Sequence, residues 1–342
     1  MEVYLLDNSF NTVGIIDNCI TLEAAKRFFS PGEFRMTLKG KAHLSSAYAL
    51  YEPVSKSCFI IEGYEEEGGK TTLSGRSLEA LLEKRILDGR GRYSGNAEKA
   101  VRLAVEKSTS GERSLSGMIL GDVSGLEGEG YFESDYRNLS EFAYSTLRTF
   151  GAAYRVELSG NTPVFIVVTG KDRSRNQTQN TPAVFSESMG NVTDGRVKID
   201  ISEHKNTAYV LGADGRSVTV VTEASPFDRR ELFVSGRDLY PEDFATEDEY
   251  FEALKSRGLE TLSRYGGAVT YSGCASGGLR FGVDYDLGDI CEIDTSSGMT
   301  LTERITEVKY TFHGRDTLTV TPLFGGFSVS LDEYIRDSVR QV

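Results

Sequence analysis

Several features are scarce in this chain of 342 residues, and each scarcity excludes a class of protein. The 38 Lys and Arg residues are outnumbered by 51 Asp and Glu residues, which gives a formal net charge of −13. Nucleic-acid binding needs a clustered basic surface, so we expect no sequence-specific nucleic-acid partner. No apolar run approaches the roughly 20 residues that cross a bilayer, so we expect no membrane segment. The first residues, MEVYLLDNSF, turn polar too soon for a secretory signal.

Residues that hold metals are also scarce. The three histidines, His43, His204 and His313, form no close pair, whereas a zinc site needs ligands at short fixed spacings. The four cysteines form no CxxC pair, which favours reduced, mostly buried thiols. We therefore expect neither a metal nor a cofactor. The cysteines are Cys19, Cys58, Cys274 and Cys291.

Common catalytic motifs are absent from the sequence. It contains no GxSxG, no GxxxxGK[ST] and no GxGxxG between a strand and a helix, so we predict no catalytic residues. A hydrolase that uses two carboxylates, such as those in the run Glu65 to Glu67, stays an alternative, because 51 acidic residues do not identify one pair. A module that binds host glycans through some of the 17 tyrosines is another alternative.

Two charged clusters need an interpretation. Asp284, Asp286 and Asp289 lie in VDYDLGDI, which lacks the glycine and the terminal glutamate of a calcium loop. We interpret that run as a turn entering a strand. The basic cluster lies in the polar segment 171–182, which we interpret as a solvated and mobile turn. Its members are Lys171, Arg173 and Arg175.

Period-two alternation between apolar and polar residues predicts a protein rich in strands. In residues 33–38 the apolar Phe34, Met36 and Leu38 alternate with polar residues. The tract 281–325 contains three strand candidates joined by turns rich in Gly, Asp and Ser, which is typical of a small barrel or sandwich. Strands are expected at 2–6, 13–16, 19–29, 33–38, 49–51, 58–64, 70–75, 153–158, 164–169, 197–201, 208–211, 218–223, 290–293, 301–312 and 318–321.

Helical spacing predicts helices at 78–85, 96–107, 138–150 and 246–265. Ser77, Asn138 and Thr246 are candidate N-caps, and Gly151 stands where a left-handed C-terminal residue is needed. Gly258 is expected to bend or break the last of these helices. Two helices followed by the hairpin 153–169 indicate an α+β insertion of about 90 residues, and a short amphipathic helix is expected at 331–342.

Six segments in order resemble the siphovirus-type tail proteins of phages and prophages, similar to baseplate hub and tail-tip proteins. They are SGRSLEALLEKRI, VVTGKDRS, AVFSESMGNV, KNTAYVLG, GVDYDLGDI, and RITEVKYTF followed by PLFGG. The resemblance runs over nearly the whole chain. Cys291 and the SSG at residues 296–298 depart from the more hydrophobic or charged residues expected there.

The resemblance implies an α+β, β-rich fold with two small β-barrel domains and α+β insertions. It assigns residues 1–92 to the first barrel, completed by strands near 183–203, and 93–182 to an α+β insertion. Residues 204–328 form the second barrel, with a helical insertion at about 246–265, and 329–342 form a C-terminal tail.

The same resemblance implies a structural role without catalysis. Three copies form a ring that joins the distal tail tube to the tip or baseplate, so the expected partners are sister copies, a tube or distal tail protein, and tip or fibre proteins. The family's hub region has no catalytic residues. The expected location is the virion tail, after assembly in the bacterial cytoplasm.

Overall fold

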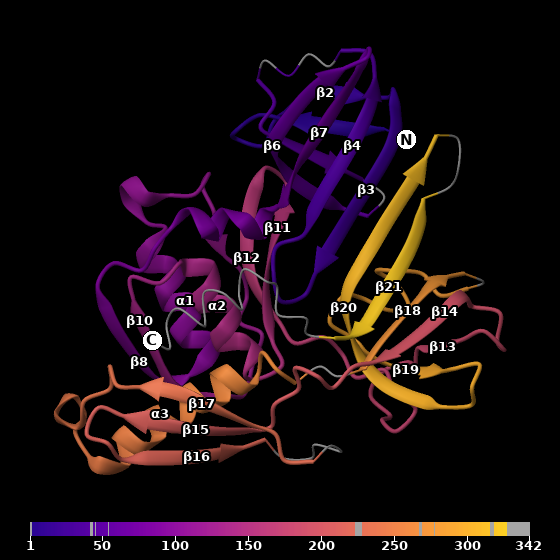
Figure 1. Cartoon of the computed structure of the whole chain (residues 1–342). Helices are drawn as coiled ribbons and strands as arrows, with labels where there is room; N and C mark the ends of the chain where they lie inside the picture. The colour runs from indigo at the N-terminus through magenta and orange to yellow at the C-terminus, as the bar shows by residue number, and fades with distance from the viewer. Residues whose placement is uncertain are drawn as a thin grey trace.

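The computed structural model describes residues 2–41, 44, 46–53, 55–222, 228–266, 269–276, 278–314 and 318–326. One sheet of 13 strands, almost all antiparallel, links the two ends of this described chain (Figure 1). Its order is β14-β18-β21-β20-β3-β4-β7-β6-β5-β1-β2, and β13 and β19 branch from β20. The β-rich fold with few helices agrees with the predicted class. The pairings of described residues form an open path, so two closed small barrels stay a prediction.

The first half of the sheet comes from the N-terminal strands. In β4, Phe34, Met36 and Leu38 are buried while Arg35 is exposed, as the alternation predicts. Phe34 packs against Phe59 of β6 with ring centroids 5.3 Å apart. The strands are β1 (Val3–Leu6), β2 (Thr12–Ile16), β3 (Cys19–Arg27), β4 (Glu33–Lys39), β5 (Ala49–Glu52), β6 (Ser57–Glu67) and β7 (Lys70–Ser77).

The second half comes from strands far along the chain. β20 pairs with β3, from Glu307 opposite Arg27 to His313 opposite Thr21. β13 pairs with β19 and β14 with β18, so the strands near 183–203 lie in this half, whereas we expected them beside the first barrel. The strands are β13 (Val184–Ser186), β14 (Val192–Ile199), β18 (Val269–Ala275), β19 (Ile290–Asp294), β20 (Thr300–His313) and β21 (Thr319–Gly325).

An inserted α+β unit follows β7. Asn138 caps α2 by accepting the backbone N–H of Ser140 at 3.0 Å, and Gly151 has φ +66°, so both end signals are confirmed. Ser77 precedes a 3₁₀ helix and does not cap it, because its hydroxyl accepts the backbone N–H of Gly32 at 2.8 Å. The elements are η1 (Leu78–Lys84), β8 (Arg90–Asn96), α1 (Ala97–Ser108), η2 (Gly111–Arg113), β9 (Ile119–Leu120), β10 (Glu129–Asp135), α2 (Leu139–Arg148), β11 (Ala153–Ser159) and β12 (Thr162–Val168).

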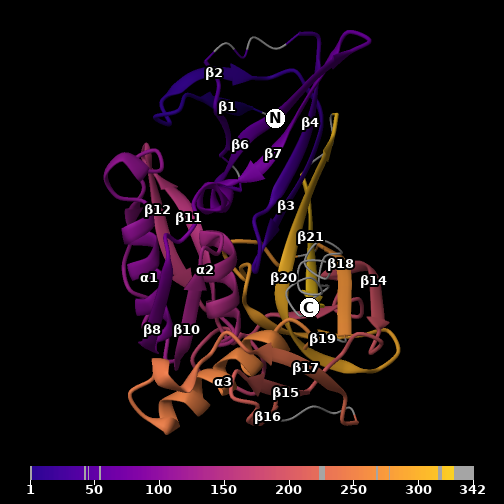
Figure 2. The same cartoon turned by 60° about the vertical axis from the view of Figure 1, so that its left-hand side comes forward.

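A second inserted unit places α3 against a three-stranded sheet beside the first inserted unit (Figure 2). Thr246 caps α3 as predicted, by accepting the backbone N–H of Glu249 at 3.2 Å. Gly258 does not break this helix, because the missing side chain lets the helix lie close to Val210 and Val220. The elements are β15 (Thr207–Gly212), β16 (Ser217–Val221), β17 (Glu231–Gly236), η3 (Pro241–Asp243) and α3 (Glu247–Leu262). The predicted helix 331–342 lies outside the described residues.

Candidate assembly surface

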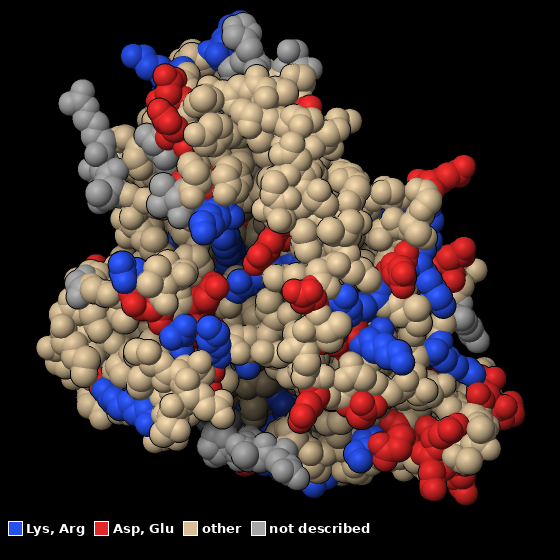
Figure 3. All heavy atoms as spheres, turned by 180° about the vertical axis from the view of Figure 1, so that it is seen from behind, with Lys and Arg blue, Asp and Glu red and all other residues tan. Residues whose placement is uncertain are grey.

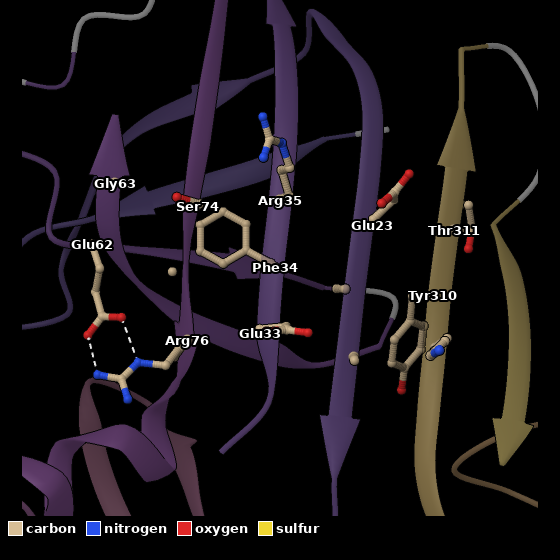
Figure 4. A pocket seen from close by; sticks show the side chains of 14 residues that line it. Glu23, Glu33, Phe34, Arg35, Glu62, Gly63, Ser74, Arg76, Tyr310 and Thr311 are labelled. Carbon is tan, nitrogen blue, oxygen red and sulfur yellow. Dashed lines mark hydrogen bonds and ion pairs between the residues drawn. The ribbon is translucent and has the colours of Figure 1, made fainter. Parts of the chain in front are cut away.

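A groove of about 710 Å³ crosses one face of the main sheet, over β3, β4, β6, β7 and β20 (Figure 4). Pairing between β3 and β20 brings its two sides together from opposite ends of the described chain. Glu23 lies opposite Arg35 on one neighbouring strand and opposite Thr311 on the other. The groove therefore exists only because the two halves of the chain share one sheet.

The floor of the groove is built from small residues. On the opposite, buried face of the same strands, a Cβ atom at Gly75 would lie 1.8 Å from the carbonyl oxygen of Ile60 and 2.9 Å from the Phe34 ring. A Cβ atom at Gly63 would lie 2.3 Å from the Ser74 hydroxyl oxygen. Since larger residues do not fit, β6 and β7 approach each other closely and the floor stays low.

Ion pairs line the walls of the groove. Arg76 donates to Glu62 twice, from Nε to Oε2 at 2.7 Å and from Nη2 to Oε1 at 2.9 Å. This hydrogen bonding lowers the pKa of the Glu62 carboxyl below its ordinary value. A general acid needs a carboxyl with a raised pKa, so Glu62 is unsuited to that role.

A second ion-pair network fastens the two halves of the sheet beside the groove. Arg27 on β3 pairs with Glu33 on β4 and, at 3.0 Å, with Glu307 on β20. Lys309 lies 3.3 Å from Glu307. These contacts span three adjacent strands, and the resulting surface is polar with mixed charge.

The interpretation of the basic cluster as a solvated, mobile turn is wrong for Arg173. Only 11% of its side chain is exposed, and its Nε donates to Asp289 at 2.6 Å. The backbone N–H of Lys171 donates to the same carboxylate at 2.7 Å. Arg175 pairs with Asp294 at 2.7 Å and with Glu292 at 3.0 Å. The segment is held because its cations reach carboxylates far along the chain, which local composition does not reveal.

The acidic run at 284–289 forms turns that lead into β19, as predicted. Asp286 is paired with Arg155 at 3.4 Å, and Asp284 accepts the backbone N–H of Arg280 at 2.9 Å. The third carboxylate is the buried partner of Arg173. Among the described residues no group of three or more His, Cys, Asp or Glu side chains is arranged to hold a metal ion.

The cysteines and histidines do not converge on one place in the described structure. All four cysteines are free, and Cys58 and Cys291 are buried. Burial raises the pKa of Cys58 to about 12, which leaves its thiol protonated and unreactive at neutral pH. His204 is buried, and His313 is exposed at the end of β20. His43 lies outside the described residues.

Sequence reasoning missed the groove. Alternation in β4 predicts that Glu33 and Arg35 point away from the core, but it does not reveal which strands lie beside β4. The one sequence feature that points to the groove is the alternating pattern of β20, in which the residues that face outward are polar. Pairing between β3 and β20 joins residues about 280 positions apart, and no local pattern encodes it.

Charge is unevenly distributed over the surface. Figure 3 shows acidic side chains gathered over the unit that carries α3. Exposed residues at the start of this helix include Glu247, Asp248 and Glu249. In the part of the chain that the structure describes, we find no helix long and apolar enough to cross a membrane.

The chain is similar in fold to three solved tail proteins. It shares 12% identity and a TM-score of 0.58 with prophage tail protein gp18 from Listeria monocytogenes EGD-e, covering 100% of this chain and 99% of that one. The tail protein from Neisseria meningitidis MC58 gives 12% identity, a TM-score of 0.60 and 95% coverage of each chain. The prophage MuSo2 43 kDa tail protein from Shewanella oneidensis gives 11% identity, a TM-score of 0.58, and coverage of 95% and 98%.

Sequence comparison identifies the family. No curated protein matches the chain significantly. The sequence model for the family described as Siphovirus ReqiPepy6 Gp37-like protein matches residues 2–326, which is nearly the whole chain. The chain therefore belongs to this siphovirus tail protein family, as the resemblance in its sequence implied.

Proposed function

We propose that the chain is a structural component of a bacteriophage or prophage tail, a hub-like ring protein between the distal tail tube and the tail tip or baseplate. The family match over residues 2–326 carries this proposal. The fold shared with three tail proteins supports it. In this role the chain works in the virion tail after assembly in the host cytoplasm, with tube, distal tail and tip proteins as partners.

The ring contains three copies, each contributing two barrel-like halves. The predicted boundaries at 1–92, 93–182, 204–328 and 329–342 belong to this proposal. Pairing of β3 with β20 supports it, because this pairing joins the N-terminal and C-terminal strand groups in one rigid sheet. Rotational symmetry then repeats that sheet around an axis and closes the assembly at a fixed number of copies.

The groove face lines the central channel in this arrangement. Ala25, Gly63 and Ser74 keep its floor low, and its lining includes three carboxylates and three cations. A surface of balanced charge holds a passing polyanion only weakly, because tight binding needs clustered cations. In this role the chain holds the neighbouring tail proteins in place, and it acts without a catalytic residue or a cofactor.

Electron microscopy of assembled tails, with native mass measurement of the tip complex, tests the proposal. We expect three copies of the chain in a ring at the distal end of the tube. A single copy in the tip complex, or a position elsewhere in the particle, would overturn the hub role.

A second candidate function is glycan binding at the host surface, and one observation favours it. Tyr209 and Phe233 lie directly opposite each other on β15 and β17 and are 38% and 46% exposed. Arg229 donates to the Tyr209 hydroxyl at 2.7 Å and holds the ring in place. Fixed aromatic rings beside polar groups are suited to sugars.

Binding to purified host cell walls tests this second candidate. If it holds, Tyr209→Ala with Phe233→Ala abolishes binding, while Val123→Ala, which changes an exposed apolar residue on another unit, leaves it intact. Absence of wall binding by the unsubstituted chain removes the candidate.

A further inference from the structure

Among the described residues, β2, β6, β13 and β14 of the main sheet have unpaired edges, and those of β6 and β14 lie at opposite sides of the molecule (Figure 1). In the described part of the chain, β14 pairs with β18 alone. β6 pairs with β5 only over Ser57 to Ile60, and beyond this its second half pairs with β7 alone. Unpaired edges expose backbone N–H and C=O groups that accept another strand.

The two edges carry opposite charge. The free half of β6 reads EGYEEE, and Glu65, Glu66 and Glu67 are all exposed. β14 ends in RVKI, where Arg196 and Lys198 are exposed. Acidic and basic strands placed side by side attract each other, whereas two copies of the same edge repel.

The charged side chains of both edges lie on the same face of the sheet. Residues directly opposite each other share a face, so the pairing can be followed strand by strand. Arg196 lies opposite Ser272 on β18, and Glu65 lies opposite Thr72 on β7. The cross-strand pairs on the strands between β18 and β7 place Ser272 and Thr72 on the same face of the sheet, which is the face that carries the groove.

Strand directions also fit. Every pairing from β14 through β18, β21, β20, β3, β4 and β7 to β6 is antiparallel. These seven steps leave β14 and β6 running in opposite directions. Rotation about a ring axis that runs along these strands keeps their directions, so β6 of one copy then lies antiparallel to β14 of the next, in a head-to-tail contact.

We infer that β6 of one copy adds to β14 of the next copy, with Glu65 opposite Lys198. This inference rests on the proposed ring and names the strands that close it. The same register places Glu67 opposite Arg196, so two carboxylates meet two cations. On the other face it places Tyr64 opposite Ile199, which are 50% and 56% exposed in the single chain.

Neighbouring registers are unfavourable. Shifting by two residues in one direction places Glu67 opposite Asp194, and in the other direction places Glu65 opposite Asp200. Like charges directly opposite each other destabilise a sheet. A shift by one residue moves Glu65 and Glu67 to the face opposite the cations of β14 and leaves Glu66 alone on their face, so one carboxylate meets a cation instead of two. The sequence of the two edges thus selects one register.

Existing contacts do not block this pairing. Lys198 forms an ion pair with Asp200 at 2.9 Å, but 62% of its side chain remains exposed. Arg196 forms no side-chain hydrogen bond or ion pair with another described residue. Both cations are therefore available to a second copy.

Charge reversal in tails assembled from the full chain tests the inference. We expect Glu65→Lys with Glu67→Lys to lower incorporation of the chain into tips about tenfold, and Arg196→Glu with Lys198→Glu to do the same. Combining all four substitutions restores it. Glu242→Lys with Asp248→Lys, an exposed pair near the start of α3, is the matched control and leaves assembly unchanged. The inference is overturned if the charge reversal on β6 or the one on β14 leaves assembly unchanged, or if combining the four substitutions does not restore incorporation.

A disulfide between copies gives a second readout that does not depend on charge. Glu65→Cys with Lys198→Cys should give linked dimers and trimers, because opposite residues lie within reach of a disulfide. Each single variant, and Glu65→Cys with Thr193→Cys out of register, should give none. A three-copy ring without this crosslink overturns the inference and leaves the hub role standing. A single copy per tip without the crosslink overturns both.

Discussion

Arg137 donates a hydrogen bond from Nη2 to Oε1 of Glu260 over 3.0 Å, and this contact ties the first inserted unit to α3 of the second. Arg264 lies 3.4 Å from the same carboxylate. Nearby, Arg257 of α3 reaches Glu133 of β10 at 2.8 Å. The side chains of Arg137 and Glu260 are each 15% exposed, so the two units are docked by an ion pair largely shielded from water.

Glu260→Gln should weaken this docking at neutral pH. Burial alone would raise the pKa of Glu260, but the charges of Arg137, Arg264 and Arg257 outweigh it and lower that pKa to about 2. Because the folded pKa lies below the unfolded one, the stabilisation is present above about pH 4.5 and is lost as the pH falls toward 2. We expect a loss of about 3 kcal/mol at pH 7, since the arginines lose their partner.

Urea unfolding at several pH values checks this prediction. The free-energy difference between the wild type and Glu260→Gln should shrink as the pH falls below about 4.5. Glu252→Gln changes a 67% exposed carboxylate on the same helix and should have little effect. A constant difference from pH 7 to pH 2.5 would contradict the assigned role.

Gly258→Ala should destabilise the protein although alanine favours helices. The new Cβ atom would lie 2.7 Å from Cγ2 of Val220 and 2.9 Å from Cγ2 of Val210. Overpacking costs about 1–3 kcal/mol, which exceeds the gain of about 1 kcal/mol in helix propensity. The urea midpoint should therefore fall, and Lys255→Ala on the exposed side of α3 should not lower it. A higher midpoint for Gly258→Ala would show that α3 moves freely away from the sheet.

Asp289→Ala should loosen the segment 171–182. Arg173 and the backbone of Lys171 would lose their acceptor, and an uncompensated buried cation costs about 3–5 kcal/mol. Hydrogen exchange should rise in this segment and in β19. Asp284→Ala, which breaks a contact with the 71% exposed Arg280, serves as the control and should change little.

Calcium should not affect stability. The carboxylates of Asp286 and Asp289 already accept hydrogen bonds from Arg155 and Arg173, so binding a cation would require breaking those pairs. We expect the same Tm with excess calcium and with a chelator. A calcium-dependent rise in Tm that disappears in Asp289→Asn would establish a metal site in the run.

Local signals in the sequence predict the helices well, and long-range pairings poorly. Asn138 and Thr246 cap their helices through contacts two or three residues away, so the sequence contains the whole interaction. The contacts of Arg27 with Glu307 and of Arg173 with Asp289 span 280 and 116 positions. Both depend on which strands become neighbours, and many strands in this chain have similar alternation. The groove and the unpaired strand edges depend on which strands pair with one another. The resemblance to a family indicates the general fold but not these individual strand pairings.

Glu303→Gln should stabilise the protein at alkaline pH, the reverse of the effect at Glu260. Burial raises the pKa of Glu303 to about 7, and the side chain has no ion pair with a described residue. The folded state therefore holds its proton more tightly than the unfolded state, and stability falls as the pH rises from about 4.5 to about 7. The substitution removes this loss, which is up to about 3 kcal/mol at pH 8 and absent at pH 4. Urea unfolding at both pH values measures the difference, with the exposed Glu23→Gln as the control. Equal stability of wild type and Glu303→Gln at pH 8 would mean that this carboxylate is well solvated when charged.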